Sequence, residues 1–195
     1  MPVSQQTDRK RSAYNERLAA GFEKCRDITR TYGTSFYFAT QFFPRETRNG
    51  IYAIYAFARI PDEIVDNPTK PDRNAALAEM REWREQWLVA MAAGRSDDDV
   101  MNAIVFAFNK YGIPIEYGEA FLKSMFQDEE KNSYRNYAEL EDYMYGSAGV
   151  IGLMVTRVVG YSSEAAFPFA EKLGYAFQMT NFLRDIREAC DELGR

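Results

Sequence analysis

Apolar residues recur at intervals of three and four along almost the whole chain, which is the spacing of one face of an α-helix. No stretch shows the alternation of a half-buried strand, so the pattern predicts an all-α protein. Glycine, proline and polar clusters divide the chain into segments. We expect helices over Tyr14–Thr31, Thr34–Thr40, Pro44–Asp66, Arg73–Ala93, Val100–Tyr111, Ile115–Gln127, Tyr137–Val159 and Glu164–Arg195, with a loop over Asp128–Asn136. No linker composition appears, so a single domain over residues 1–195 is expected, with about the first 7 to 12 residues flexible.

The central helix carries acids on a largely apolar cylinder. At about 100° per residue, Tyr55, Arg59, Asp62 and Asp66 fall within a sector of roughly 60°. The remaining positions are mainly apolar, so the helix is expected to be buried, and buried carboxylates need a cation, a metal or hydrogen bonds. Pro61 should kink this helix or end its regular part just before the acids. Two interpretations stay open here: a functional site, or an arginine paired with acids on a solvated helix end.

A second segment, LGYAFQMTNFLRDIRE, repeats this arrangement near the end of the chain. On a helical wheel Gln178, Asn181, Asp185 and Glu188 converge on one side, and Arg184 flanks them. Hard oxygen ligands without histidine or cysteine suit Mg²⁺, which commonly bridges carboxylates to a substrate phosphate. Two such helices facing one another would provide a place for Mg²⁺ and a diphosphate leaving group held by two arginines.

Composition narrows the possible functions. The chain has no histidine, which excludes a Ser-His-Asp triad and most zinc or iron sites, and its two cysteines have no metal-binding spacing. A net charge of −5 without a long basic run argues against nucleic-acid binding. The 195 residues contain 14 Phe, 13 Tyr and 2 Trp, which indicates a wide apolar interior. No signal peptide and no membrane-spanning segment are evident, so a cytoplasmic protein is expected, with peripheral membrane contact left open.

Several blocks of this sequence resemble the squalene and phytoene synthases, the head-to-head prenyl transferases, and the phytoene synthase type most of all. The blocks are Ser35-Phe36-Tyr37, the run AIYAFAR that leads to Asp62 and Asp66, the run YMYGSAG from Tyr143 to Gly149, and AFQMTNFLRDIRE. They occur in the family's order over almost the whole chain.

The resemblance implies an isoprenoid synthase fold, a helical bundle in which two acidic helices face each other over a central apolar cavity. It also implies condensation of two allylic prenyl diphosphates, of geranylgeranyl or farnesyl length, through a cyclopropylcarbinyl diphosphate to phytoene or a squalene-type hydrocarbon. The implied cofactor is Mg²⁺, with NADPH needed only if the product is squalene. Such a site must be dry and aromatic, because water would trap the carbocation.

The resemblance also assigns roles position by position. Asp62 and Asp66 would bind metal in the first acidic stretch, and Asn181, Asp185 and Glu188 in the second. Substrate contacts would come from Ser35, Tyr55, Arg59, Gln178 and Arg184, catalytic tyrosine chemistry from Tyr143, and tunnel walls from Phe36, Ile151, Val155, Leu173 and Phe177. Tyr143 could use its ring to stabilise an allyl cation and its hydroxyl to relay a proton.

Plainer interpretations accompany several of these assignments. Tyr143 fits an ordinary core tyrosine, and Ser35 fits a helix cap. Gly146, Gly149 and Gly152 fit either close helix packing or room for substrate.

Three departures from the family pattern favour an alternative function. Glu63 stands where a second Asp is frequent, Ala189 stands where the second motif normally supplies its last Asp, and the chain is expected to lack the family's C-terminal third. The alternative is a catalytically impaired relative or fragment that binds a prenyl chain or a protein partner without turnover.

Overall fold

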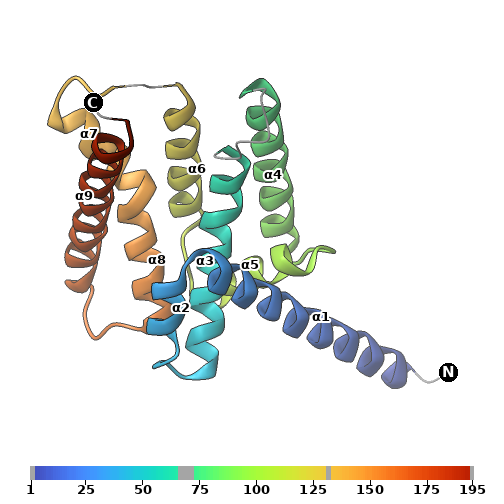
Figure 1. Ribbon diagram of the computed structural model, residues 1–195. Coiled ribbons are helices and arrows are strands. Elements are labelled where there is room, and N and C mark those ends of the chain that lie inside the picture. Colours follow the sequence, from blue (N-terminus) through green and yellow to red (C-terminus); the bar gives the residue numbers. More distant parts are fainter. Residues whose placement is uncertain (1–2, 66–72, 131–132, 194–195) are drawn as a thin grey trace. The chain divides into compact units, whose positions relative to one another are not determined.

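The computed structural model describes the backbone of residues 3–65, 73–130 and 133–193, and the side chains of residues 12–65, 73–127 and 133–184. These parts of the chain are helical and contain no strand (Figure 1). The helices are α1 (Val3–Tyr32), α2 (Thr34–Thr40), α3 (Arg45–Val65), α4 (Arg73–Ala93), α5 (Asp99–Lys110), α6 (Ile115–Glu130), α7 (Tyr137–Met144), the π-helix η1 (Tyr145–Gly149), α8 (Val150–Val159) and α9 (Ala166–Leu193). The predicted all-α class is therefore confirmed.

Three sequence predictions about helix boundaries were wrong. The predicted loop does not begin at Asp128, because α6 extends to Glu130. Helix α1 begins at Val3, well before the predicted start at Tyr14. Helix α3 continues through Pro61 to Val65, so the proline does not end the helix before Asp62, and the alternative of a kink stays a prediction. Pro61 has no N–H to donate to the Phe57 carbonyl, but it is buried, and this burial offsets part of the lost hydrogen bond.

Contacts divide the chain into two compact units, residues 1–113 and 114–195. The predicted single domain stays a prediction.

The first unit has an aromatic core where α3, α4 and α5 meet. The ring of Phe57 lies 5.2 Å from that of Trp87 and 5.1 Å from that of Phe108, and all three side chains are almost fully buried. Tilted aromatic pairs at this separation are attractive beyond their burial of area. The core thereby fixes one face of α3 and leaves its other face available for polar residues.

Helix α1 packs against α3 and α5. Cys25 of α1, Tyr52 and Ala56 of α3, and Ala103 of α5 form one buried cluster. Near Asp99 the approach is so close that a Cβ on Gly21 would lie 2.1 Å from the Asp99 carbonyl oxygen. Arg17 and Lys24 of α1 add ion pairs to the Asp99 carboxylate at 3.1 and 2.8 Å.

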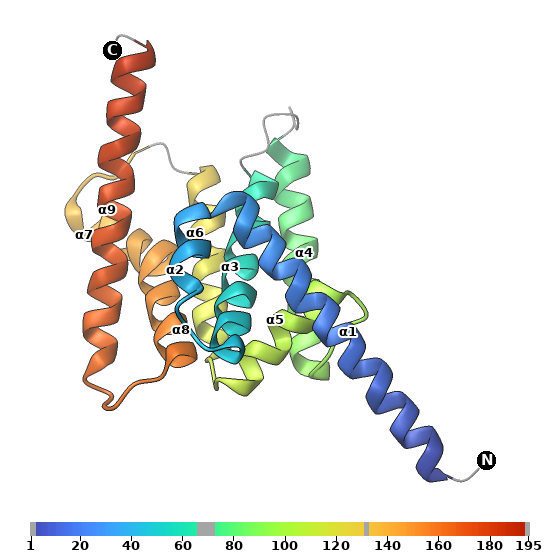
Figure 2. The same cartoon turned by 60° about the horizontal axis from the view of Figure 1, so that its bottom comes forward.

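In the second unit α7, η1 and α8 follow one another without a break, as the predicted helix Tyr137–Val159 requires, and α9 packs against η1 and α8 (Figure 2). Glycines permit the close approach. A Cβ on Gly174 would lie 2.5 Å from the Ala148 carbonyl oxygen, and one on Gly152 would lie 2.4 Å from that of Ala170. These glycines therefore permit close packing of the helices. The packing lies beside the π-helix η1, and π-helical turns are often found at functional sites.

Candidate functional site

Tyr55, Arg59 and Asp62 lie on successive turns of α3, away from the buried face formed by residues such as Ala53 and Phe57. The prediction that the acid is buried was wrong for Asp62, whose side chain is 36% exposed. The aromatic core covers only one side of α3, so the side that carries Asp62 remains open to a ligand or to solvent.

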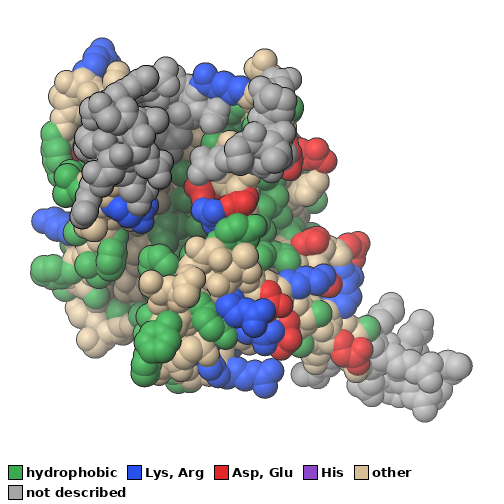
Figure 3. Space-filling view, viewed as in Figure 1, with side chains coloured by type: hydrophobic (Ala, Val, Ile, Leu, Met, Phe, Trp, Pro, Cys, Tyr) green, Lys and Arg blue, Asp and Glu red, His purple; other side chains and the backbone are tan. Residues whose placement is uncertain are grey.

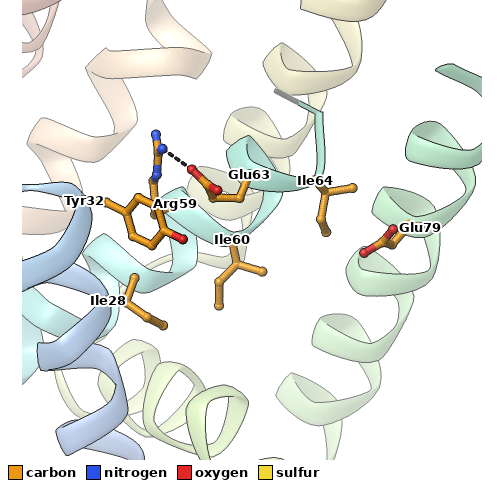
Figure 4. A pocket seen from close by; sticks show the side chains of 7 residues that line it. All are labelled: Ile28, Tyr32, Arg59, Ile60, Glu63, Ile64 and Glu79. Atoms are coloured by element: carbon orange, nitrogen blue, oxygen red, sulfur yellow. Dashed lines mark hydrogen bonds and ion pairs between the residues drawn. The ribbon is translucent and has the colours of Figure 1, made fainter. Parts of the chain in front are cut away.

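Arg59 is contacted by two acids of its own helix and by a ring from α1. One terminal nitrogen of its guanidinium donates to Asp62. The other donates to Glu63, as Figure 4 shows. The guanidinium carbon lies 4.7 Å from the centre of the Tyr32 ring. The predicted pairing of Arg59 with an acid is therefore present, and it is part of a larger arrangement.

These groups line a pocket of about 310 Å³ between α1, α3 and α4. Figure 4 shows Ile60 and Ile64 between the Arg59–Glu63 pair of α3 and Glu79 of α4. The lining residues are Ile28, Tyr32, Arg59, Ile60, Glu63, Ile64 and Glu79. The Nε–H of Arg59 is buried and finds no acceptor among the described residues. A buried donor without an acceptor is unfavourable. The guanidinium has five N–H donors, which is more than its two contacts with Asp62 and Glu63 engage.

Tyr55 lies between Arg59 and the start of α2. Burial raises the pKa of Tyr55, and the positive charge of Arg59 opposes that increase. Its ring is 6.1 Å from the ring of Phe36. Ser35 is exposed in the first turn of α2. Tyr55 therefore keeps its proton at neutral pH and can donate a hydrogen bond.

In the second unit, Tyr143 of α7 is buried against aromatic rings. It is 4% exposed, its ring stacks 6.2 Å from that of Phe182 on α9, and the ring of Tyr134 lies 5.3 Å away. Gln178 is half-buried on α9, whereas Asn181 and Arg184 are exposed. The structure therefore shows Tyr143 in a core-like environment and the amide and arginine groups at the surface of this unit.

Several predicted ligands lie outside what the structure describes. Asp66 is outside the described residues, and for Asp185 and Glu188 only the helical backbone of α9 is described. Among the side chains that are described, no group of three or more Asp, Glu, His or Cys residues could hold a metal ion. The predicted Mg²⁺ ligand set thus stays a prediction, and Asp62 and Asn181 are its described members.

Large apolar side chains are exposed on both units, and Figure 3 shows such green areas between charged ones. Phe36 is 60% exposed, and Leu173 and Phe177 are each 57% exposed. Ile151 and Val155 are half-buried on α8. Their predicted role as tunnel walls stays a prediction, but the three exposed side chains are free to contact an apolar ligand.

The sequence analysis assigned no role in the site to Glu63 or Tyr32. Glu63 follows Arg59 by four residues, a spacing that places both on one side of a helix, and this was the available signal. The contact with Tyr32 depends on the packing of α1 against α3, and no local pattern reveals it.

Comparison with known proteins decides the family. The squalene/phytoene synthase family profile matches residues 29–195. The chain belongs to the squalene/phytoene synthase family. This confirms the resemblance, and the matched region includes the whole of α3 and α9.

Among relatives, the chain is 35% identical over 177 residues to phytoene synthase 3 of Zea mays, covering 88% of this chain and 41% of the relative. It is 33% identical over 183 residues to 15-cis-phytoene synthase of Synechococcus elongatus, covering 88% and 58%. The chain therefore spans about half the length of these curated relatives.

Two solved structures confirm the predicted isoprenoid synthase fold. A ligand-bound dehydrosqualene synthase matches with a TM-score of 0.80 and 27% identity, covering 93% of this chain and 62% of that protein. A squalene synthase of Alicyclobacillus acidocaldarius matches with a TM-score of 0.78 and 26% identity, covering 91% and 65%. Separately, no helix within the described residues is long and apolar enough to cross a membrane.

Proposed function

We propose that this family member acts in the head-to-head condensation of two allylic prenyl diphosphates to phytoene or a squalene-type hydrocarbon, with loss of pyrophosphate. The observation that carries the proposal is the family match across residues 29–195, which includes both acidic stretches. The intermediate would be a cyclopropylcarbinyl diphosphate, and the substrate would be of farnesyl or geranylgeranyl length.

In this proposal the diphosphate is bound mainly by arginines. Arg59 presents a planar fork with five N–H donors, of which Asp62 and Glu63 engage one nitrogen each. The remaining donors match the geometry of a phosphate better than a lysine ammonium does. Arg184, Ser35, Tyr55 and Gln178 are proposed as further substrate contacts.

The donor chemistry of the described residues fits Mg²⁺. Asp62 and Asn181 supply hard oxygen atoms, and both side chains are accessible. With Asp66, Asp185 and Glu188 they would form the proposed ligand set. Bound Mg²⁺ would neutralise the charge that develops on the departing diphosphate.

The apolar surface suits the rest of such a substrate. Phe36, Leu173 and Phe177 are proposed to contact the prenyl chain and exclude water from the allylic cation. The buried ring of Tyr143 is proposed to face that cation with its π density, and its hydroxyl to move a proton. A peripheral membrane contact would let the apolar hydrocarbon product pass into the bilayer. A cytoplasmic location stays part of the proposal.

Ala189 supports a second candidate, a relative that binds prenyl diphosphate without turnover. A methyl group cannot ligate a metal, so metal affinity in the second stretch would depend on Asn181, Asp185 and Glu188. In this case the chain would bind the diphosphate and the prenyl tail but release no pyrophosphate.

One experiment separates the two candidates. The protein is incubated with Mg²⁺ and farnesyl or geranylgeranyl diphosphate, with and without NADPH, and both extracted hydrocarbon and released pyrophosphate are measured. We expect hydrocarbon from the parent protein and a loss of about 10²-fold or more for Asp62→Asn. The matched control is Asp97→Asn, an exposed acid elsewhere in the same unit. Saturable binding of the prenyl diphosphate without product would favour the second candidate. Absence of both binding and product would reject both candidate functions.

A further inference from the structure

Arg59 is held from three directions by groups that have different origins. Asp62 and Glu63 lie three and four residues along the same helix, and Tyr32 reaches the guanidinium from the end of α1. Figure 4 shows Glu63 joined to Arg59 and Tyr32 beside it. Together the three contacts restrict the rotation of a side chain that would otherwise sample many rotamers.

Stability alone does not account for this arrangement. The side chains of Arg59, Asp62 and Glu63 are 30%, 36% and 38% exposed, and ion pairs at that exposure contribute little to folding. Glu23 and Arg26 form a more exposed pair on α1, with side chains 63% and 37% exposed, and neither lines the pocket beside Arg59. The contacts of Arg59 therefore differ from the common type in what surrounds them.

The two acids do not have the same task in the proposed function, on which this inference rests. Asp62 is a proposed metal ligand, and a carboxylate drawn to a cation holds Arg59 less well. Glu63 belongs to no proposed ligand set. We propose that Glu63, together with Tyr32, is the positioning residue that keeps the Arg59 guanidinium oriented toward the diphosphate when Asp62 turns to the metal.

Tyr32 contributes through its ring. A guanidinium 4.7 Å from a ring centre is attracted by the negative face of the aromatic system. The hydroxyl is not needed for that attraction. Tyr32→Phe should therefore keep the contact with Arg59, and Tyr32→Ala should remove it.

The test measures binding of inorganic pyrophosphate by calorimetry, with Mg²⁺ and with EDTA, and needs no turnover. With Mg²⁺, Glu63→Ala should weaken binding about three- to fivefold, and Glu63→Gln less, because glutamine keeps an oxygen acceptor. With EDTA the effect should shrink, since Asp62 is then free to hold Arg59. Tyr32→Phe should bind as the parent does, and Tyr32→Ala should resemble Glu63→Ala.

Controls make each outcome decisive. Arg59→Ala should bind most weakly, and Glu23→Ala, which removes the pair with Arg26, should match the parent protein. Circular dichroism checks that each variant is folded. The inference is overturned if the parent protein does not bind pyrophosphate, or if Glu63→Ala binds it with the same affinity as Glu23→Ala. It is also overturned if Glu63→Ala binds pyrophosphate more tightly than the parent, because Glu63 would then compete with the ligand for Arg59. If affinities follow the expected order but no hydrocarbon forms, the proposed function fails and this inference stands.

Discussion

A Cβ on Gly33 would lie 2.6 Å from the hydroxyl oxygen of Tyr55, so the absence of a side chain at Gly33 defines where that tyrosine can lie. The contact joins the turn between α1 and α2 to the polar side of α3. The nearest atoms belong to the far end of the Tyr55 side chain, which can move more easily than backbone. The tyrosine is therefore expected to yield when position 33 gains a side chain.

We predict that Gly33→Ala displaces Tyr55 and costs about 1–3 kcal/mol of stability through overpacking. The proposed condensation activity should fall as well, because Tyr55 leaves the neighbourhood of Arg59. Thermal unfolding and hydrocarbon formation measure the two effects. In a Tyr55→Leu background the added methyl group should cost less, and an equal cost in both backgrounds would show that the clash lies elsewhere.

The contact between α9 and η1 supports a second prediction. In Gly174→Ala the new methyl group would lie 2.5 Å from the Ala148 carbonyl oxygen, a backbone atom that cannot move without shifting the π-turn. We expect a loss of about 1–3 kcal/mol in urea unfolding followed by circular dichroism. Ala176→Ser, at an exposed position of the same helix, is the control and should stay near the parent value. Equal stability of both variants would contradict the close packing.

The helices themselves were largely predictable because the 3.6-residue period is a local property of the sequence. The predicted Arg73–Ala93 agrees with α4, and the predicted Val100–Tyr111 and Ile115–Gln127 differ from α5 and α6 by a few residues at their ends. The end of α3 was not predictable from Pro61, because the tolerance of a helix for proline depends on the burial of that residue, which is a tertiary property. The π-turn at Tyr145–Gly149 was missed since glycines alone do not distinguish it from ordinary close packing.

For the site, the sequence identified the polar stripe of α3 but not its degree of exposure. Helical spacing placed Arg59 near Asp62, and the structure confirms that neighbourhood. The ring of Tyr32 and the pocket walls come from α1 and α4, so they depend on tertiary packing that no periodicity reveals. The acids at positions 66, 185 and 188 remain sequence predictions.

Cys25 supports a prediction about reactivity. Its side chain is fully buried, and burial raises the pKa of the thiol to about 12. The thiolate is the reactive form, so very little of the reactive species is present at pH 8. In a Cys190→Ser variant, the remaining thiol should resist a disulfide reagent at pH 8 and react once urea unfolds the chain. Rapid labelling of the native variant would contradict the burial of Cys25.

Asp99 should make part of the stability depend on pH. Hydrogen bonds from Lys24 and Arg17 hold the pKa of this carboxyl below its usual 3.8. A depressed pKa stabilises the folded state above the unfolded value, and this contribution disappears as pH falls through the folded value. The melting temperature of Asp99→Asn should therefore lie below that of the parent protein at pH 5 to 7, with the gap closing below about pH 4. Asp97→Asn serves as an exposed comparison, and a gap that persists in acid would assign the effect to something other than charge.

Tyr143 allows the ring and the hydroxyl to be tested separately. Tyr143→Phe keeps the ring that stacks on Phe182, whereas Tyr143→Leu loses about 0.5–1.5 kcal/mol of ring interaction in addition to buried area. If the hydroxyl relays a proton, Tyr143→Phe should lower kcat by about 10²-fold or more at nearly unchanged KM. Full activity of Tyr143→Phe would remove the hydroxyl from the mechanism. In that case the comparison with Tyr143→Leu measures the ring alone, because a catalytic ring predicts a fall in kcat larger than the loss of stability explains.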